Sequence, residues 1–84
     1  MFEEDDIVIY NGQYRVVEKV STTSVHFKDY NKETLFSFAP ISLVRKISTE
    51  DSFTDFLDNQ SYDSEFCKIF GKAIAKYLKK NINL

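Results

Sequence analysis

The sequence predicts an α+β fold, with a five-stranded antiparallel β-barrel followed by a pair of C-terminal α-helices packed on it. Up to residue 47, short runs of β-branched and aromatic residues alternate with polar residues between turn signals, which is typical of hairpin-linked strands. From residue 53 onward, apolar residues recur every three or four positions, which is typical of amphipathic helices. The length of 84 residues favours one domain over residues 1–84, with the barrel at 5–48 and a helical hairpin at 49–80.

The first two strands are predicted to join at Asn11-Gly12, because this pair favours a two-residue type I′ turn. In that register Tyr10 faces Gln13 and Ile7 faces Val16. The face that we expect to enter the core carries Ile7, Ile9, Tyr14 and Val16. The face that we expect to meet solvent, or to be half covered, carries Val8, Tyr10, Gln13, Arg15, Val17 and Lys19. Burying this second face would carry Arg15 inward, which costs several kcal/mol unless its guanidinium is paired.

Three more strands are predicted between residues 25 and 47. The third places Val25 and Phe27 on one face, and the fourth, within the run LFSFA, places Phe36 and Phe38 on one face. Pro40 cannot donate to a strand ladder, so the run APISL is expected to form an irregular or 3₁₀ turn. Residues 44–47 then return as a short last strand.

The run DIVIYNG at residues 6–12, the hairpin-linked strands and the closing run APISLVRKI resemble an SH3-like small β-barrel over roughly residues 5–48. This resemblance implies a domain that binds peptides or nucleic acid through loops and one open face. The chain has no tryptophan, which peptide-binding members carry on the ligand groove, and it lacks the clustered basic loops of nucleic-acid-binding members. Because one fold hosts many functions, the resemblance indicates the fold rather than the ligand.

Two helices are predicted after the barrel. The first should begin at the capping box Ser48-Thr49-Glu50-Asp51 and end at Asn59, with Phe53, Phe56 and Leu57 on its apolar face. The second should begin at Ser61 as the cap and continue to Lys80. Its apolar face comprises Tyr62, Phe66, Ile69, Phe70, Ala73, Ile74, Tyr77 and Leu78.

The composition argues against several function classes. The 13 acidic and 11 basic residues nearly balance, so no overall field favours nucleic acid. The lone Cys67, the acidic N-terminus and the lack of a long apolar run favour a cytoplasmic protein without a membrane span. His26 and Cys67 lie in different predicted elements, so we expect no enzyme activity, no metal and no cofactor. The acidic clusters Glu3–Asp6 and Asp51, Asp55 and Asp58 are interpreted as solvated faces.

Charge is segregated in the helical half of the chain. Residues 49–65 hold six acids and no base, whereas residues 66–84 hold five lysines and no acid. These lysines are Lys68, Lys72, Lys76, Lys79 and Lys80. One interpretation is that they complement the helix dipole, and the other is that they form a basic flank for phosphates, anionic lipid or an acidic protein. Both interpretations stay open at this point.

A ridge of small side chains is predicted on the second helix, where Cys67, Gly71 and Ala75 lie four residues apart. A glycine in mid-helix is unfavourable, so Gly71 suggests a close neighbour. That neighbour is either the barrel or first helix, or else a second protomer or a target helix. The oligomeric state is not predicted.

The leading functional hypothesis is a non-enzymatic module that binds a protein partner, acidic if the lysines take part. Its predicted contacts are the five lysines together with Val8, Tyr10, Arg15 and Val17. The small size and aromatic-rich composition also resemble accessory proteins of phages and other mobile elements, some of which inhibit host enzymes or defence systems. The alternative hypothesis is a nucleic-acid-binding small barrel. In it Tyr10, Tyr30 and His26 would stack on bases, and Arg15, Lys19 and Lys28 would contact phosphates.

Overall fold

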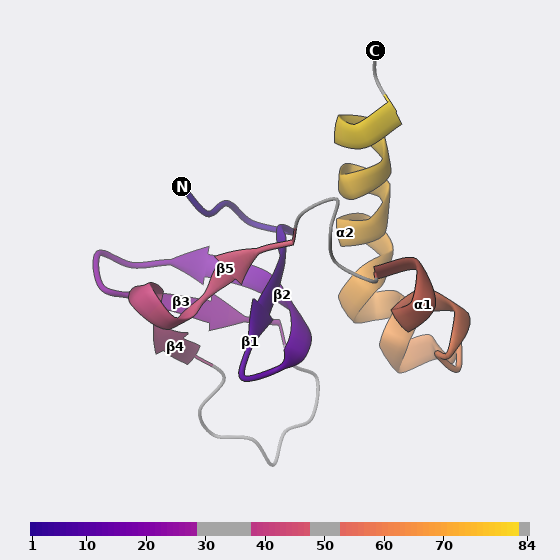
Figure 1. Ribbon diagram of the computed structural model, residues 1–84, viewed down its shortest axis with the longest axis horizontal. Coiled ribbons are helices and arrows are strands. Elements are labelled where there is room, and N and C mark those ends of the chain that lie inside the picture. Colours follow the sequence, from indigo (N-terminus) through magenta and orange to yellow (C-terminus); the bar gives the residue numbers. More distant parts are fainter. Residues whose placement is uncertain (29–37, 48–52, 83–84) are drawn as a thin grey trace.

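The structure, a computed structural model, describes residues 1–28, 38–47 and 53–82, and side chains up to Lys79. Figure 1 shows the strands gathered on one side of the molecule and the helices α1 and α2 on the other. The elements in chain order are β1 (Ile7–Tyr10), β2 (Gln13–Val20), β3 (Ser24–Phe27), β4 (Phe38–Pro40), the 3₁₀ helix η1 (Ile41–Leu43), β5 (Arg45–Lys46), α1 (Phe53–Asp58) and α2 (Ser64–Ile82). The strands form one five-stranded antiparallel sheet in the order β4-β3-β2-β1-β5, which confirms the α+β class.

The β1–β2 hairpin has the predicted register. Ile7 pairs with Val16, and Tyr10 pairs with Gln13. Asn11 and Gly12 both adopt positive φ, at 53° and 75°, as a type I′ turn requires. The Asn-Gly signal therefore fixed both the turn and the pairing.

The predicted exposure of the second hairpin face is wrong. Val8 and Val17 have 0% relative exposure, as fully covered as Val16 on the predicted core face. The hairpin separates two cores, and each of its faces lines one of them. The first core, beside β3, β4 and η1, contains Val8, Val17, Val25, Phe27, Ala39 and Val44. The second core, beside the helices, contains Ile7, Val16, Phe53, Phe70 and Ala73.

Arg15 does not prevent burial of that face, because its side chain has an aromatic neighbour. The guanidinium carbon lies 4.5 Å from the centroid of the Phe27 ring, within the range of a cation–π interaction. Tyr10 stacks on the same ring, with 5.7 Å between centroids. The Arg15 guanidinium and the Tyr10 ring therefore both contact Phe27 of the first core, and Val8 and Val17, on the same face of the hairpin, are buried in that core.

The edge strand β4 buries Ala39 and turns Phe38 to the outer face, while the predicted shared face of Phe36 and Phe38 is not tested. Val25 pairs with Ala39, and both are buried, whereas His26 pairs with Phe38 on the outer face. Phe38 is 46% exposed and stacks on His26 at 5.4 Å. Phe36 lies outside the described residues. The 3₁₀ turn and the last strand are confirmed, and β5 pairs with β1.

The helices pack on the sheet through the second core. Phe53 of α1 is buried there, and Phe56 and Leu57 contact it as predicted. The predicted cap of α2 at Ser61 is wrong by two residues, because Oδ1 of Asp63 accepts a hydrogen bond from the Phe66 N–H at 2.8 Å. The predicted capping box of the first helix, at residues 48–51, lies outside the described residues. No helix in the described part of the chain is long and apolar enough to cross a bilayer.

Candidate functional site

Lys76, predicted to belong to a basic flank, instead fastens α2 to the N-terminal segment. Its Nζ lies 2.9 Å from Oδ1 of Asp6 and 3.5 Å from Oε2 of Glu3, and it donates to the Glu4 carbonyl at 2.7 Å. Lys46 of β5 approaches the other Asp6 oxygen at 3.6 Å. We call the contacts of Asp6 with Lys46 and Lys76 the N-terminal clasp.

The environment of Asp6 stabilises its charged form. Burial alone would raise its pKa, because Asp6 is only 7% exposed. Hydrogen bonds from Lys76 and from the Glu3 N–H, together with the charges of Lys76 and Lys46, outweigh burial and lower the pKa below its ordinary value. Burial would likewise lower the pKa of Lys76, but Asp6 and Glu3 raise it. The clasp is thus an ionised pair at neutral pH, and the interpretation of residues 3–6 as a solvated face is wrong for Asp6.

The other lysines of α2 remain on the surface. Lys68, Lys72 and Lys79 are exposed and lie on one side of the helix, since residues three and four apart are neighbours there. None of the three forms an ion pair within the described part of the chain. The side chain of Lys80 lies outside the described residues. We call Lys68, Lys72 and Lys79 the lysine face.

The predicted ridge of small side chains also faces outward. Cys67, Gly71 and Ala75 are all exposed, and a Cβ built on Gly71 would meet no described atom within 4 Å. The interpretation that Gly71 makes room for the barrel or the first helix is therefore wrong. The second interpretation, a protomer or target helix, stays a prediction. The ridge lies next to the lysine face on the same helix.

The residues of β1 and β2 that were predicted to contact a partner are wholly or partly buried within the chain. Val8 and Val17 have no exposed surface, and Tyr10 and Arg15 are half-buried against Phe27. Two of the predicted phosphate contacts are also engaged, since Arg15 lies over that ring and Lys28 pairs with Asp5. Tyr30 lies outside the described residues. In the structure, Val8 and Val17 therefore belong to the core, and Arg15 and Lys28 contact other side chains of the fold.

Sequence reasoning missed a groove between the β1–β2 turn and the helices. Two adjoining hollows of about 400 and 450 Å³ share Gln60 and Phe70 as lining residues. We call them together the aromatic groove. Its apolar lining comprises Tyr14, Phe56, Phe66, Ile69 and Phe70. Its polar lining comprises Gln13, Asn59, Gln60, Ser61, Asp63 and Glu65, and Gly12 completes it.

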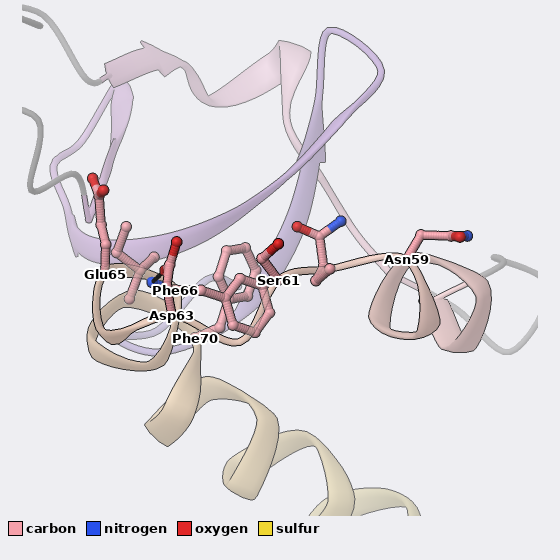
Figure 2. A pocket seen from close by; sticks show the side chains of 8 residues that line it. Asn59, Ser61, Asp63, Glu65, Phe66 and Phe70 are labelled. Atoms are coloured by element: carbon pink, nitrogen blue, oxygen red, sulfur yellow. Dashed lines mark hydrogen bonds between the residues drawn. The ribbon is translucent and has the colours of Figure 1, made fainter.

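Aromatic stacking shapes the floor of the groove. The rings of Phe66 and Phe70 are nearly parallel, with 4.7 Å between their centroids. The centroid of the Phe56 ring lies 5.6 Å from that of Phe70. Figure 2 shows the rings of Phe66 and Phe70 beside the segment that carries Asn59 and Ser61. Asp63 and Glu65 lie at the start of α2. Phe66 and Phe56 are half-buried, so part of their apolar surface faces the hollow. The aromatic repeat in the sequence predicted the apolar face of the helix. It did not indicate that part of this face would stay exposed to solvent.

The described residues bring together no catalytic pair. Cys67 is exposed on α2, whereas His26 stacks on Phe38 at the far edge of the sheet. Within the described part of the chain, no group of three or more histidine, cysteine or acidic residues could hold a metal ion. The candidate functional features of the described residues are two surfaces, the lysine face and the aromatic groove.

Comparison of the chain with protein-family models, with curated proteins and with solved structures finds no match.

Proposed function

We propose that this chain is a non-enzymatic interaction module that binds an acidic protein partner through the lysine face of α2. The observation that carries the proposal is that Lys68, Lys72 and Lys79 are exposed together, while Lys76 on the same helix is held by Asp6. A lysine that stabilised the fold through an ion pair would be expected to have an acidic partner, as Lys76 does. Lys68 and Lys72 also lie well before the last turn of α2, where a cation would complement the helix dipole. Exposed charges of one sign steer a complementary partner toward a surface.

A protein partner fits these surfaces better than nucleic acid does. Phosphate binding needs several cations along one track. Of the barrel cations expected to form such a track, Arg15 lies over Phe27 and Lys28 pairs with Asp5, while Lys19 is exposed. The exposed ridge of Cys67, Gly71 and Ala75 beside the lysine face also suits the close approach of another backbone.

The SH3-like barrel is part of this proposal. Its support is the position of β5 beside β1 and the convergence of side chains from β1, β2, β3 and β4 on the first core. A strongly curled sheet would enclose such a core. The 3₁₀ turn before β5 brings Val44 into the same cluster.

The proposal is tested with Lys68, Lys72 and Lys79 changed together to glutamine, which keeps helix propensity while removing charge. The matched control changes the same three residues to arginine. Proteins from source-cell lysate that are retained by the wild-type chain and by the arginine control should be lost from the glutamine variant. With the purified partner, the glutamine variant should associate about tenfold more slowly, and its rate should depend less on salt.

Two outcomes would overturn the proposal. One is equal retention of every captured protein by the glutamine variant, which would place the contact elsewhere. The other is tight binding of a mixed-sequence oligonucleotide that weakens steeply with salt, because that slope reports released counterions and would favour the nucleic-acid alternative.

A further inference from the structure

We propose that the aromatic groove is a second binding site, which takes a partner segment carrying an aromatic or aliphatic side chain next to lysine or arginine. On α2 this site begins beside the lysine face, because Glu65 lies one turn before Lys68. It is lined from β1–β2, from the α1–α2 junction and from the first turns of α2. The proposal goes beyond the proposed function, because its ligand has the opposite charge.

The shape and lining of the groove indicate an apolar anchor. The two hollows meet at Gln60 and Phe70 and together extend from Gly12 to Glu65. Phe70 is almost covered, whereas Phe56, Phe66, Ile69 and Tyr14 keep part of their surface uncovered. An aromatic or branched aliphatic side chain laid on these rings would remove that surface from water. Such anchors in central pockets dominate protein interfaces.

The rim of the groove indicates a basic neighbour for that anchor. Asp63 and Glu65 line the groove, and Asp58 lies at the end of α1 next to it. All three are exposed, and none forms an ion pair within the described part of the chain. The sequence from residue 49 to 65 contains no lysine or arginine. Lys68 lies one turn after Glu65 but forms no ion pair with it, so the rim carboxylates are open to a partner's cation.

A single guanidinium could use both features of the site. Arginine stacks on aromatic faces and pairs with carboxylates through the same planar group. The chain already contains one such stack, because Arg15 lies 4.5 Å from the Phe27 centroid. In the hollow at the start of α2, the ring of Phe66 and the carboxylates of Asp63 and Glu65 offer these two surfaces to a partner's arginine.

The experiment is a selection of random dodecapeptides, displayed on phage, on the immobilised full chain. The expected result is enrichment of sequences that combine a Phe, Tyr, Trp or Leu with adjacent Lys or Arg. Two variants then locate the contact of a selected synthetic peptide. Ser61→Trp fills the groove from an exposed position, and Glu65→Lys reverses one rim charge. Each should weaken binding by about tenfold or more.

Matched controls separate the groove from general effects and from the lysine face. Thr22→Trp and Glu18→Lys make the same changes at exposed positions in the sheet half and should leave peptide affinity unchanged. The lysine-face glutamine variant should also keep the peptide, so this test can fail while the proposed function stands, and the reverse holds as well. Selection of no peptide that combines an apolar side chain with Lys or Arg would overturn the inference, and so would wild-type affinity of the Ser61→Trp and Glu65→Lys variants.

Discussion

The two acidic segments of this chain look alike in sequence and differ in the structure. Near the N-terminus, Asp5 and Asp6 are covered by lysines from three other elements, namely Lys28 after β3, Lys46 of β5 and Lys76 of α2. Around the α1–α2 junction, Asp58, Asp63 and Glu65 are exposed and form no ion pair with another described residue. The first segment is a fold contact and the second is a surface feature.

The difference teaches that acidic composition alone does not separate structure from function. A carboxylate that is buried needs partners, because an unpaired buried charge is costly. A carboxylate at an exposed helix start is already favoured by the dipole and, in Asp63, by capping. Only the second kind can change partners without unfolding the protein.

Replacing Asp6 with alanine should give the largest effect. Lys76 and the Glu3 N–H would lose their acceptor, so we expect a loss of about 1–3 kcal/mol in the free energy of unfolding. Urea unfolding followed by circular dichroism measures this loss. The same change at Asp58 is the control, and an equal loss there would erase the distinction between the two segments.

The partner side of the clasp gives the next test. Lys76→Gln should lower stability by about 1 kcal/mol, because glutamine can still donate to Asp6 or to the Glu4 carbonyl but lacks the charge. Lys72→Gln, one turn earlier and exposed, should change stability by less than about 0.5 kcal/mol. Thermal midpoints of both variants compare them directly. If Lys72→Gln were the more damaging change, the lysine face would be structural.

Changing pH should loosen the clasp at both extremes. The pKa of Asp6 is lowered in the fold, so its contribution is complete above the unfolded value of about 3.9 and is lost as pH falls through the folded pKa. The pKa of Lys76 is raised, so its contribution is complete below about 10.4 and is lost as pH rises through the folded pKa. Stability measured against pH should therefore fall less steeply in acid for Asp6→Asn than for the wild type. Parallel curves would contradict this assignment.

Gly71→Ala should stabilise the chain. A Cβ at this mid-helix position meets no described atom within 4 Å, and alanine is better than glycine in a helix interior by about 0.8–1 kcal/mol. A raised thermal midpoint, with an unchanged sedimentation profile, is the expected result. A lowered midpoint would mean that a second copy or another part of the chain packs closely on the ridge, and that this side of α2 is not open.

Neutralising the groove rim should have the smallest effect. Asp58→Asn and Glu65→Gln together should shift stability by less than about 0.5 kcal/mol, since neither exposed carboxylate forms an ion pair within the described residues. Chemical unfolding of the double variant beside wild type checks this value. A loss comparable to that of Asp6→Ala would show that this segment, too, is held by a fold contact.

Local signals in the sequence predicted local structure well. Asn11-Gly12 fixed the hairpin register, because a type I′ turn admits only one pairing. Pro40 predicted the 3₁₀ turn, and the apolar repeat predicted the buried side of α2 except for Tyr62 and Leu78, which are exposed. The predicted N-cap of α2 was wrong by two residues because serine and aspartate are both good caps. Only the hydrogen bond from the Phe66 N–H to Asp63 distinguishes Asp63 from Ser61.

Long-range contacts were not predictable in the same way. The alternation of apolar and polar residues predicted that Val8 would be exposed. A strand that lies between two cores buries both of its faces, and alternation alone does not indicate this. Lys76 matched the spacing of the lysine face, and nothing near it in sequence pointed to Asp6. The aromatic groove arises where residues 12–14 meet residues 56–70, so its concavity depends on tertiary packing rather than on any one motif.

The clasp also sets an order of events during synthesis. Asp6 leaves the ribosome 70 positions ahead of Lys76, and at roughly 5–20 residues per second this amounts to a wait of roughly 4–14 s. The first core, drawn from residues 8–44, can close during that time. Ile7 and Val16 cannot be covered until α1 and α2 emerge, so the nascent sheet presents one apolar face to the cell. Chaperone binding to this chain should therefore be strongest on intermediates that have completed β5 and still lack α2.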